Sequence, residues 1–557
     1  MVRRRRNRHR ASAWRAALVL LASASFLCLL FAPARDDDKL RAFLAWRPEV
    51  EPLLLIGLLA LLALAGRRLP ALARWLLAGL VLVAAALQSA DALVLAIFDR
   101  PLDLYFDLPH VPQLVALFVA AAGLWRGVAA VAAVVLAVGA LVALIARMIA
   151  ACERALQPPR HAAGALAALM LLAAMAPVGQ LEAEEPLLGT RTVPVVAAQT
   201  TRLWRALRVM NGYDRRYAAV LAAPQPAAGG LPGLKRRDVY LVFFESYGTV
   251  LLDEPRYAAA VAPALDDFAA TVGQAGWHLL SSRMISPTFG GGSWLAHGTI
   301  DSGLKLDPLL TRLITASGRE TLPRYMRAAG YRSIEIMPGI RAPEADRGFW
   351  GFERSVYAAD LGYDGPPFGW FGIPDQFTLR RLDETEGAPG HGPLFAQIVL
   401  VSSHTPFAPV PPYVADWDAA PLYRAIPQAQ WDRIYAPPDW SHLEAPYLES
   451  IAYDLRTLAA WLARLPGDAL VIILGDHQPP SFIAGQMQPW TVPVHVLSRD
   501  GDLLRPFRAR GYVEGALPPR DGAVQGMESF LGDFIDGFAQ PPALAANRRE
   551  PLEHGTN

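Results

Sequence analysis

The sequence predicts an α-helical membrane domain followed by a water-soluble α/β domain, whose mainly parallel sheet lies between helices. Three observations lead to this prediction. The chain has 557 residues, more than one ordinary domain. Apolar residues make up 53% of it, above the average for globular proteins, and the excess lies before residue 180. After residue 236, short apolar runs alternate with helical patterns.

Five apolar stretches in the first 180 residues are long enough, or nearly so, to cross about 30 Å of hydrocarbon. They cover residues 14–32, 50–66, 71–98, 127–149 and 161–178. The first follows a run of arginines, as in a signal peptide, but no small-residue cleavage site is evident, so we interpret it as an uncleaved anchor. Residues 112–125 are also apolar. We interpret this shorter segment as a re-entrant or interfacial piece, with a sixth crossing as the alternative.

Basic and acidic residues alternate between the loops that join these stretches. Arg67 and Arg154 belong to basic loops, and the extreme N-terminus is basic too, whereas Asp36 and Asp103 belong to acidic loops. Loops rich in Arg and Lys stay in the cytoplasm. Five crossings therefore place everything after about residue 180 outside the cytoplasm, with residues 1–180 as the transmembrane domain.

Residues 181–235 are predicted to connect the two halves. Residues 201–217 mix apolar side chains with arginines, which indicates either an amphipathic helix on anionic lipid or a helix docked on the soluble domain with a solvated basic face. Prolines and glycines at 224–233 then mark a linker. The soluble domain is expected to cover residues 236–542, and residues 543–557 form a tail.

Charge and cysteine usage exclude two classes of protein. The formal net charge is +1, and no basic stretch is interleaved with aromatic residues, so nucleic acid is not an expected partner. Both cysteines, Cys28 and Cys152, lie in or beside the apolar half. The soluble half therefore has no disulfide framework and depends on its own core.

The soluble half alternates strand-like and helix-like segments. Strands are predicted at residues 238–244, 331–337, 395–402, 470–475 and 492–497. Helices are predicted at residues 260–275, 321–329 and 449–465. This alternation is typical of a mainly parallel sheet covered on both faces, with a functional site at the carboxyl ends of its strands.

Three of the predicted strands end on residues that can bind a metal. One stops at Glu245, another leads to His404, and a third ends on adjacent Asp476 and His477. Carboxylate and imidazole groups are ligands for divalent cations, and the carboxyl ends of parallel strands meet at one edge of a sheet. The sequence therefore predicts a metal site at this edge.

A glycine-rich segment, residues 286–294, precedes another candidate. Three consecutive glycines allow close approach of a ligand to the backbone, and Ser293 follows them where a helix is expected to begin. A hydroxyl at a helix N-terminus beside a divalent cation has its alkoxide stabilised by both. Ser293 is therefore a candidate nucleophile, and a simple helix N-cap is the alternative.

These motifs follow one another as in a known family. Phe244-Glu245-Ser246, the glycine-rich loop with Ser293, Ser403-His404-Thr405-Pro406-Phe407 and Gly475-Asp476-His477 resemble the sulfatase-like branch of the alkaline phosphatase superfamily. More narrowly, the chain resembles bacterial inner-membrane phosphoethanolamine and phosphoglycerol transferases and lipoteichoic acid synthases. The resemblance covers nearly the whole chain. It implies an alkaline-phosphatase-like soluble domain on the periplasmic or extracytoplasmic side of the inner membrane.

The resemblance also implies a site and a reaction. Glu245, Ser293, Asp476 and His477 would hold one divalent metal, zinc or manganese, and a second metal is possible. The Ser293 hydroxyl would attack a phospholipid donor and form a covalent phospho-headgroup ester. An extracytoplasmic glycan or lipid acceptor would then take the headgroup phosphate.

The sequence departs from the family in three places. The transferases typically have threonine where this chain has Ser293, which makes a hydrolase a real alternative. Sulfatases need Pro two residues and Arg four residues after the nucleophile, where this chain has Leu295 and His297, so sulfatase activity is not expected. Phe349-Trp350 is similar to the glycerol-phosphate pocket of the lipoteichoic acid enzymes, but the following Arg is out of register at Arg354. The sequence therefore does not decide whether the transferred headgroup is phosphoglycerol or phosphoethanolamine.

Other residues near these motifs are weaker candidates. His404 could bind phosphoryl oxygens, protonate the leaving alkoxide or ligate a second metal. His297 falls one turn after Ser293 and could contact substrate or fill a gap in the core. Trp294 and Trp350 are further candidates for substrate contact.

Three more polar residues are expected to serve the fold. Asp375 resembles a helix N-cap, with a pocket residue as the alternative. His495 lies inside a predicted strand, and Asp454 lies in a helix beneath the site. The rival functions are a phosphodiesterase or phosphatase with the same site, and an inactive relative that senses or carries lipid.

Overall fold

The computed structural model describes residues 2–30, 50–112, 115, 119, 124–179, 192–211, 215–227, 229–341, 347–387, 391–418, 422–423, 426, 438–521 and 524–540. The chain divides into two compact units. Met1–Leu95 and Arg100–Arg208 form the first, and Ala96–Asp99 and Val209–Asn557 form the second. Most of the predicted re-entrant segment at residues 112–125, and the predicted tail at 543–557, lie outside the described residues.

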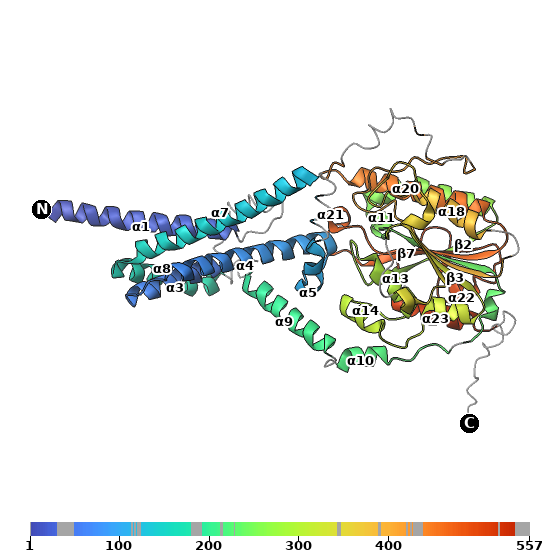
Figure 1. Ribbon diagram of the computed structural model, residues 1–557, viewed down its shortest axis with the longest axis horizontal. Helices are drawn as coiled ribbons and strands as arrows, with labels where there is room; N and C mark the ends of the chain where they lie inside the picture. Colours follow the sequence, from blue (N-terminus) through green and yellow to red (C-terminus); the bar gives the residue numbers. More distant parts are fainter. Residues whose placement is uncertain are drawn as a thin grey trace, which may run out of the picture. The chain divides into compact units, whose positions relative to one another are not determined.

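The first unit is helical (Figure 1). Its α-helices are α1 Val2–Leu30, α3 Val50–Leu64, α4 Ala71–Phe98, α5 Leu104–Asp107, α7 Leu124–Leu156, α8 Pro159–Gly179 and α9 Thr192–Met210. Within the described residues, α4 and α7 are long and apolar enough to cross a membrane, and three shorter apolar helices cover Ala13–Cys28, Val50–Leu64 and Pro159–Ala173. Helices therefore occupy all five predicted positions, and two of them have the full length of a span.

Helix α9 contains the first part of the predicted amphipathic segment. Its polar side chains bond to the chain before α5: Gln199 Nε2 and Arg202 Nη1 each donate to the Leu102 carbonyl at 2.6 Å. Its apolar residues Trp204 and Leu207 are about half exposed. The helix is therefore amphipathic, with a polar contact inside its own unit and an apolar side that faces outward.

The second unit is built on one sheet. Its described strands are β1 Asp238–Phe244, β2 His278–Ile285, β3 Arg332–Met337, β4 Arg354–Tyr357, β5 Leu394–Val399, β6 Ala469–Gly475, β7 Thr491–Ser498, β8 Val513–Glu514 and β9 Gln525–Gly526. The order is β4-β3-β5-β1-β6-β7-β2-β8, with β9 paired to β2. The run β4-β3-β5-β1-β6 is parallel, as predicted, whereas β7 is antiparallel to both of its neighbours, β6 and β2. The sheet is therefore mixed.

All five predicted strands are present. The strand predicted at 395–402 ends three residues early, at Val399, because the chain turns there to form the loop that carries His404. Strands β2, β4, β8 and β9 were not predicted. Strand β2 reads His-Leu-Leu-Ser-Ser-Arg-Met-Ile, and its polar Arg283 is buried only because it pairs with Asp253, Nη1 to Oδ2 at 2.6 Å.

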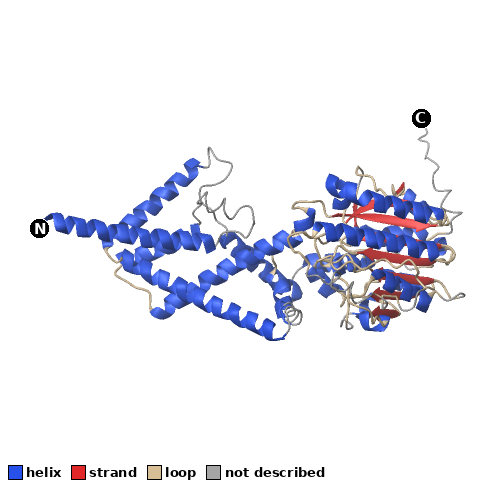
Figure 2. Ribbon diagram, turned by 90° about the horizontal axis from the view of Figure 1, so that it is seen from above, coloured by secondary structure: helices blue, strands red, loops and turns tan. Residues whose placement is uncertain are grey.

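Helices cover both faces of this sheet (Figures 1 and 2). The α-helices of this unit are α10 Arg215–Leu221, α11 Val250–Asp253, α12 Pro255–Gln274, α13 Ser293–Ser302, α14 Pro308–Ile314, α15 Leu322–Ala328, α16 Arg347–Trp350, α17 Ala358–Leu361, α18 Asp375–Glu386, α20 Glu444–Arg464, α21 Ser481–Ala484, α22 Arg505–Arg508 and α23 Phe530–Phe538. The three predicted helices correspond to α12, α15 and α20.

The alternation along β1 explains the two layers. Tyr240 and Val242 point to one face and pack in a core with α12, α18 and α20, whereas Leu241 and Phe243 point to the other and pack with α13, α15 and α23. Successive side chains of a strand face opposite ways, and a strand buried on both faces needs apolar residues at nearly every position. The charged groups of β1 and its flanks, Asp238 and Glu245, therefore lie at the two ends of the strand.

Candidate metal centre and nucleophile

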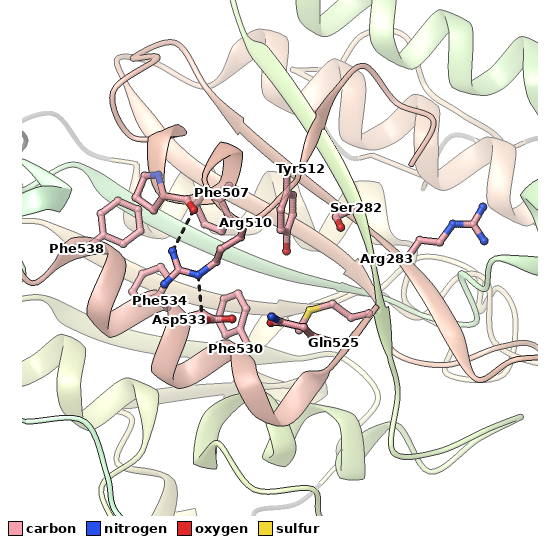
Figure 3. A pocket seen from close by; sticks show the side chains of 12 residues that line it. Ser282, Arg283, Phe507, Arg510, Tyr512, Gln525, Phe530, Asp533, Phe534 and Phe538 are labelled. Atoms are coloured by element: carbon pink, nitrogen blue, oxygen red, sulfur yellow. Dashed lines mark hydrogen bonds and ion pairs between the residues drawn. The ribbon is translucent and has the colours of Figure 1, made fainter. Parts of the chain in front are cut away.

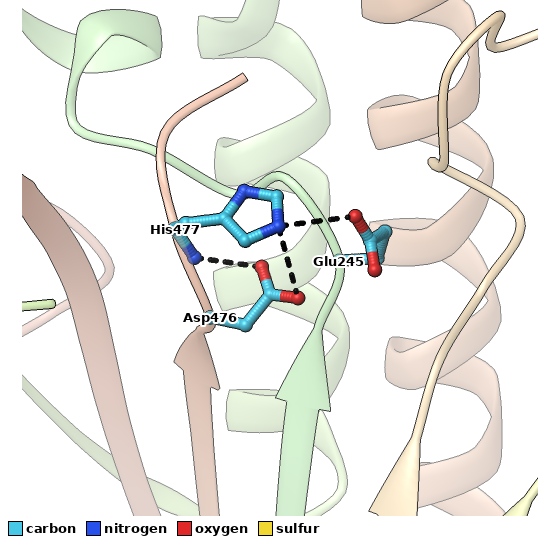
Figure 4. A group of neighbouring side chains, drawn as sticks. All are labelled: Glu245, Asp476 and His477. Carbon is cyan, nitrogen blue, oxygen red and sulfur yellow. Dashed lines mark hydrogen bonds and ion pairs between the residues drawn. The ribbon is translucent and has the colours of Figure 1, made fainter. Parts of the chain in front are cut away.

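The carboxyl ends of β1 and β6 bring three sequence-predicted residues together. The two strands are parallel neighbours, with Phe244 level with Gly475. The next residues, Glu245 and Asp476, therefore leave the sheet side by side, and His477 follows Asp476 (Figure 4). One ligand atom from each of the three lies within 4.8 Å of the others, and all three side chains are buried.

Backbone groups orient the Asp476 and His477 side chains. Asp476 Oδ1 accepts from the backbone N–H of Ser246 at 2.9 Å and of His477 at 2.7 Å. His477 Nδ1 lies 2.7 Å from the Gln478 carbonyl oxygen. A carbonyl only accepts, so Nδ1 carries the proton of the neutral ring and Nε2 keeps its lone pair. Such contacts typically orient the ligands of a metal.

The other ligand atoms of this cluster, one from each of the three side chains, face one another with their lone pairs. His477 Nε2 lies 3.4 Å from Glu245 Oε1 and 3.6 Å from Asp476 Oδ2. Asp476 Oδ2 is buried and has no hydrogen-bond partner among the described residues. Burial, and next the Asp476 carboxylate, hold the pKa of Glu245 well above its usual range. A divalent cation among these atoms would satisfy the orphaned oxygen and offset the repulsion, so the residues fit a metal.

The Ser293 hydroxyl joins the cluster. It donates to Glu245 Oε2 at 3.2 Å and lies 3.1 Å from His477 Nε2. Helix α13 begins at Ser293, and the backbone conformation of Gly292 before it, φ 76°, is one that glycine adopts without strain. Gly292 occupies the N-cap position, and the Ser293 side chain turns to the cluster. The N-cap alternative for Ser293 is therefore wrong.

His404 lies on the loop after β5. Its Nδ1 lies 2.7 Å from the Thr405 carbonyl oxygen, which leaves Nε2 as the lone-pair atom. Phe371 packs edge-on against the imidazole, with ring centroids 4.8 Å apart. Burial lowers the pKa of His404 to about 4 and is opposed by the Thr405 carbonyl; charges on His477 and Asp476 also act on it. The ring is therefore neutral at pH 7 and within electrostatic reach of the cluster.

The three weaker candidates lie in different surroundings. His297 is buried, packs on Phe243 with ring centroids 4.1 Å apart, and its Nε2 has no partner among the described residues. Burial lowers its pKa to about 4. Trp350 packs in an apolar cluster with Phe349 and its neighbours, whereas Trp294 is 47% exposed. Trp294 is therefore the more exposed of the two tryptophans, and Trp350 is partly buried.

His495, Asp454 and Asp375 are the three polar residues that the sequence assigns to the fold. His495 is buried, with Nε2 3.0 Å from the Tyr247 hydroxyl and Nδ1 2.7 Å from the Ser281 hydroxyl, as expected of a core histidine. Asp454 is buried in α20. Asp375 is the first residue of α18 and Pro374 its N-cap, and the Asp375 carboxylate accepts from another loop. The N-cap interpretation of Asp375 is therefore wrong.

Two groups of this site escaped prediction: the Ser246 N–H and the Gln478 carbonyl, which hold Asp476 and His477. Both are backbone groups, so residue type carries no signal for them. A separate cavity, away from the cluster, lies between β2, α22 and α23 (Figure 3). Its lining includes Phe507, Phe530 and an ion pair between Arg510 Nε and Asp533 Oδ1 at 3.0 Å.

No protein-family model matches the sequence, and no curated protein matches it. Solved structures do. The lipoteichoic acid synthase LtaP from Listeria monocytogenes is 13% identical, with a TM-score of 0.37 over 58% of this chain and 77% of that one. The Streptococcus pyogenes phosphoglycerol transferase GacH, in complex with sn-glycerol-1-phosphate, is 12% identical, with a TM-score of 0.36 over 61% and 83%.

The soluble domain of lipooligosaccharide phosphoethanolamine transferase A from Neisseria meningitidis is 14% identical, with a TM-score of 0.36 over 57% of this chain and 90% of that one. At such values the function must be argued from the site itself. The chain is thus similar to solved phosphoglycerol and phosphoethanolamine transferases, the group that its motifs resemble.

Proposed function

We propose that the chain is a metal-dependent transferase that moves a phospholipid-derived phospho-headgroup, phosphoglycerol or phosphoethanolamine, to an extracytoplasmic glycan or lipid. Its covalent intermediate would form on Ser293. One observation carries the proposal. A serine hydroxyl at the start of a helix lies 3.2 Å from Glu245 and 3.1 Å from His477, beside a buried carboxylate oxygen of Asp476 that has no partner in the described part of the chain.

The metal would be held by Glu245, Asp476 and His477, together with the Ser293 hydroxyl, and zinc or manganese fits these oxygen and imidazole donors. When bound, the cation supplies positive charge that lowers the pKa of the hydroxyl and neutralises the phosphodiester. The chain's own contribution is to aim the donors. Asp476 and His477 are fixed by backbone groups, and Glu245 is fixed by its place after β1.

The reaction has two steps. Ser293 Oγ attacks phosphorus and the bond to diacylglycerol breaks, so that the headgroup phosphate is esterified to the serine and the serine proton ends on diacylglycerol. In the second step an acceptor hydroxyl attacks the same phosphorus. The bond to Ser293 Oγ then breaks, and the acceptor's proton ends on the serine. Atoms and charge balance in each step.

His404 is the group we assign to relay these protons. Its Nδ1 is occupied by the Thr405 carbonyl, so Nε2 can accept a proton from the attacking hydroxyl and release it to the leaving oxygen. A pKa of about 4 keeps the ring neutral at pH 7, so Nε2 retains its lone pair. Trp294, which is half exposed next to the nucleophile, and His297 and Trp350 stay candidates for substrate contact.

We place residues 1–180 in the bacterial inner membrane with five crossings and a cytoplasmic N-terminus. Residues 181–235 form the connector, and the extracytoplasmic catalytic domain covers residues 236–542. The two long apolar helices α4 and α7 and the three shorter ones support this arrangement. It would let a phospholipid donor reach Ser293 from the outer leaflet of that membrane.

The test is the intact mass of the purified full chain after incubation with bacterial phospholipids and zinc or manganese. We expect an adduct on Ser293 whose mass identifies the headgroup, absent from Ser293→Ala. Free headgroup phosphate, without any acceptor conjugate when a glycan or lipid acceptor is present, would favour a phosphodiesterase. Failure to bind metal, with no product of either kind, would leave an inactive lipid-binding relative.

A further inference from the structure

Two carboxyl groups that the reaction does not use lie behind the loop that carries His404. Asp375 begins α18 and Asp454 lies in the middle of α20, and both side chains are fully buried. Buried carboxyl groups are rare unless they are bonded or functional. The hydrogen-bond partners of the two carboxyl groups therefore indicate their role.

Asp375 holds the backbone of the loop after β5. Its Oδ1 accepts from the Val401 N–H at 2.9 Å, and its Oδ2 accepts from the Ser402 N–H at 2.7 Å. The Asp375 N–H in turn donates to the Ser402 hydroxyl at 3.1 Å. Hydrogen bonds from N–H groups to a carboxylate are stronger than those between neutral groups. Asp375 therefore acts as an ionised acceptor that fixes residues 401–402.

Asp454 completes the pair. Neither of its oxygens faces a donor among the residues the structure describes, and the nearby Ser403 hydroxyl donates instead to the Glu245 carbonyl at 2.8 Å. A buried carboxylate without donors is costly, so Asp454 is the member that keeps a proton, whereas Asp375 accepts from two backbone N–H groups. Burial, and next the Asp375 charge, hold the pKa of Asp454 well above its usual range.

The same segment also contacts the imidazole. Trp370 and Phe371 lie in the turn before α18, and both pack on the His404 ring, with centroids 6.1 and 4.8 Å away. The Phe368 and Gly372 backbones bond to each other and close this turn. Residues 368–375 thus hold the backbone of the His404 loop at Val401 and Ser402, and hold its ring through two aromatic side chains.

We propose that Asp375, with Asp454 as its proton-bearing partner, is a positioning residue for His404. Asp375 fixes the backbone from Val401 to His404, and the orientation of the imidazole beside the metal cluster follows from it. The inference rests on the proposed function, because it assigns no chemistry to Asp375 itself. It predicts that the effect of Asp375 on the reaction passes through His404.

A double-mutant cycle tests this route. The full chain in detergent is assayed for release of labelled diacylglycerol from phosphatidylglycerol and phosphatidylethanolamine that carry a fluorescent acyl chain. A misplacement of about 1 Å costs roughly 10²-fold in rate, so Asp375→Asn should lower kcat by about that factor. In the His404→Ala background, the same substitution should cost no more than about twofold, the spread found for independent sites.

Two further variants separate the role of the Asp454 proton from that of the Asp375 charge. Asp454→Asn keeps a donor toward Asp375, so its kcat should stay within about twofold of the wild type. Asp383→Asn is the matched control for Asp375→Asn. Asp383 also lies on α18, and its carboxylate accepts from Trp461 Nε1 at 3.0 Å, away from the His404 loop. If Asp375→Asn does not fold, Phe371→Leu removes a ring contact to His404 and should show the same dependence on His404.

The outcomes are distinct. Equal losses from Asp375→Asn, or from Phe371→Leu where that variant replaces it, in the wild-type and His404→Ala backgrounds would overturn the proposal, since the effect would then bypass the imidazole. A large loss in Asp454→Asn would overturn the role given to its proton. If Ser293→Ala is inactive but His404→Ala is fully active, the proposed function stands and this inference fails. If Ser293→Ala is fully active, the proposed function fails first.

Discussion

The metal cluster and the Asp375–Asp454 pair each bury two carboxyl groups near the same edge of the sheet, yet their surroundings differ. Glu245 and Asp476 face a histidine lone pair and a serine hydroxyl, and Asp476 Oδ2 has no partner among the described residues. Both oxygens of Asp375 accept from backbone N–H groups, and the oxygens of the buried Asp454 have no partner among the described residues. Buried carboxylates beside a histidine lone pair and a serine hydroxyl thus fit a cation, whereas a buried carboxylate that meets backbone N–H groups holds a loop in place.

The largest effect should come from the nucleophile. Ser293→Ala removes the oxygen that becomes esterified, and we expect activity to fall by roughly 10⁴-fold or more. Ser302→Ala is the matched control at the other end of α13, where the hydroxyl donates to the Gly298 carbonyl and accepts from the Leu304 N–H, away from the metal cluster. The assay is release of labelled diacylglycerol. Substantial release by folded Ser293→Ala would show that the cluster acts without this serine.

Removal and return of metal should distinguish the two carboxyl pairs directly. A ligand that binds only the folded state at 100 times its Kd stabilises by about 2.7 kcal/mol. After chelation, added zinc or manganese should therefore raise the Tm of the wild type and of Asp454→Asn. Asp476→Asn, which loses a charged ligand oxygen, should show little shift. Equal shifts in all three chains would place the cation elsewhere.

His495 is a buried titratable group of another kind, one that stays neutral in the folded chain. Burial lowers its pKa to about 4, against 6.5 for a free histidine. Above pH 6.5 the ring is neutral in both states, and below it the unfolded chain takes a proton that the folded chain refuses. Stability is therefore lost as the pH falls from 6.5 through 4, by up to about 3 kcal/mol.

The measurement is Tm against pH between 7.5 and 4, with chelator present so that metal binding does not contribute. His495→Gln keeps polar contacts for Tyr247 and Ser281 but does not titrate. It should be less stable than the wild type at pH 7.5 and lose less stability on acidification. Parallel curves for the two chains would show that His495 does not contribute to acid sensitivity.

The smallest effect is expected outside both carboxyl pairs. Trp294 is 47% exposed beside the nucleophile, so Trp294→Ala should leave Tm unchanged while raising KM for the lipid, by roughly tenfold if about 1.4 kcal/mol of binding is lost. kcat should change little. Trp440→Ala, another exposed tryptophan at 63%, serves as control. An unchanged KM in Trp294→Ala would remove Trp294 from the candidate substrate contacts.

Much of the site could be anticipated because its residues follow apolar runs. A buried parallel strand must be apolar along its length, so the first polar residues after such runs, Glu245 and Asp476, mark the edge where strands end together. Strand β2 could not be anticipated, because its Arg283 is tolerated only through Asp253, which belongs to a different element. The role of Asp375 was missed for the same reason: its partners Val401 and Ser402 are backbone groups elsewhere in the chain.

The order of apolar and polar residues alone determined that the chain has an apolar helical half and an α/β half, and which polar residues stand at the strand ends. Local periodicity carries this information because it reflects which faces are buried. Tertiary contacts bring the Ser293 hydroxyl to Glu245 and His477, and bring the Asp375 carboxylate to the backbone of the His404 loop. Those contacts depend on hydrogen-bond donors brought close by folding, and a one-dimensional pattern does not record which distant groups become neighbours.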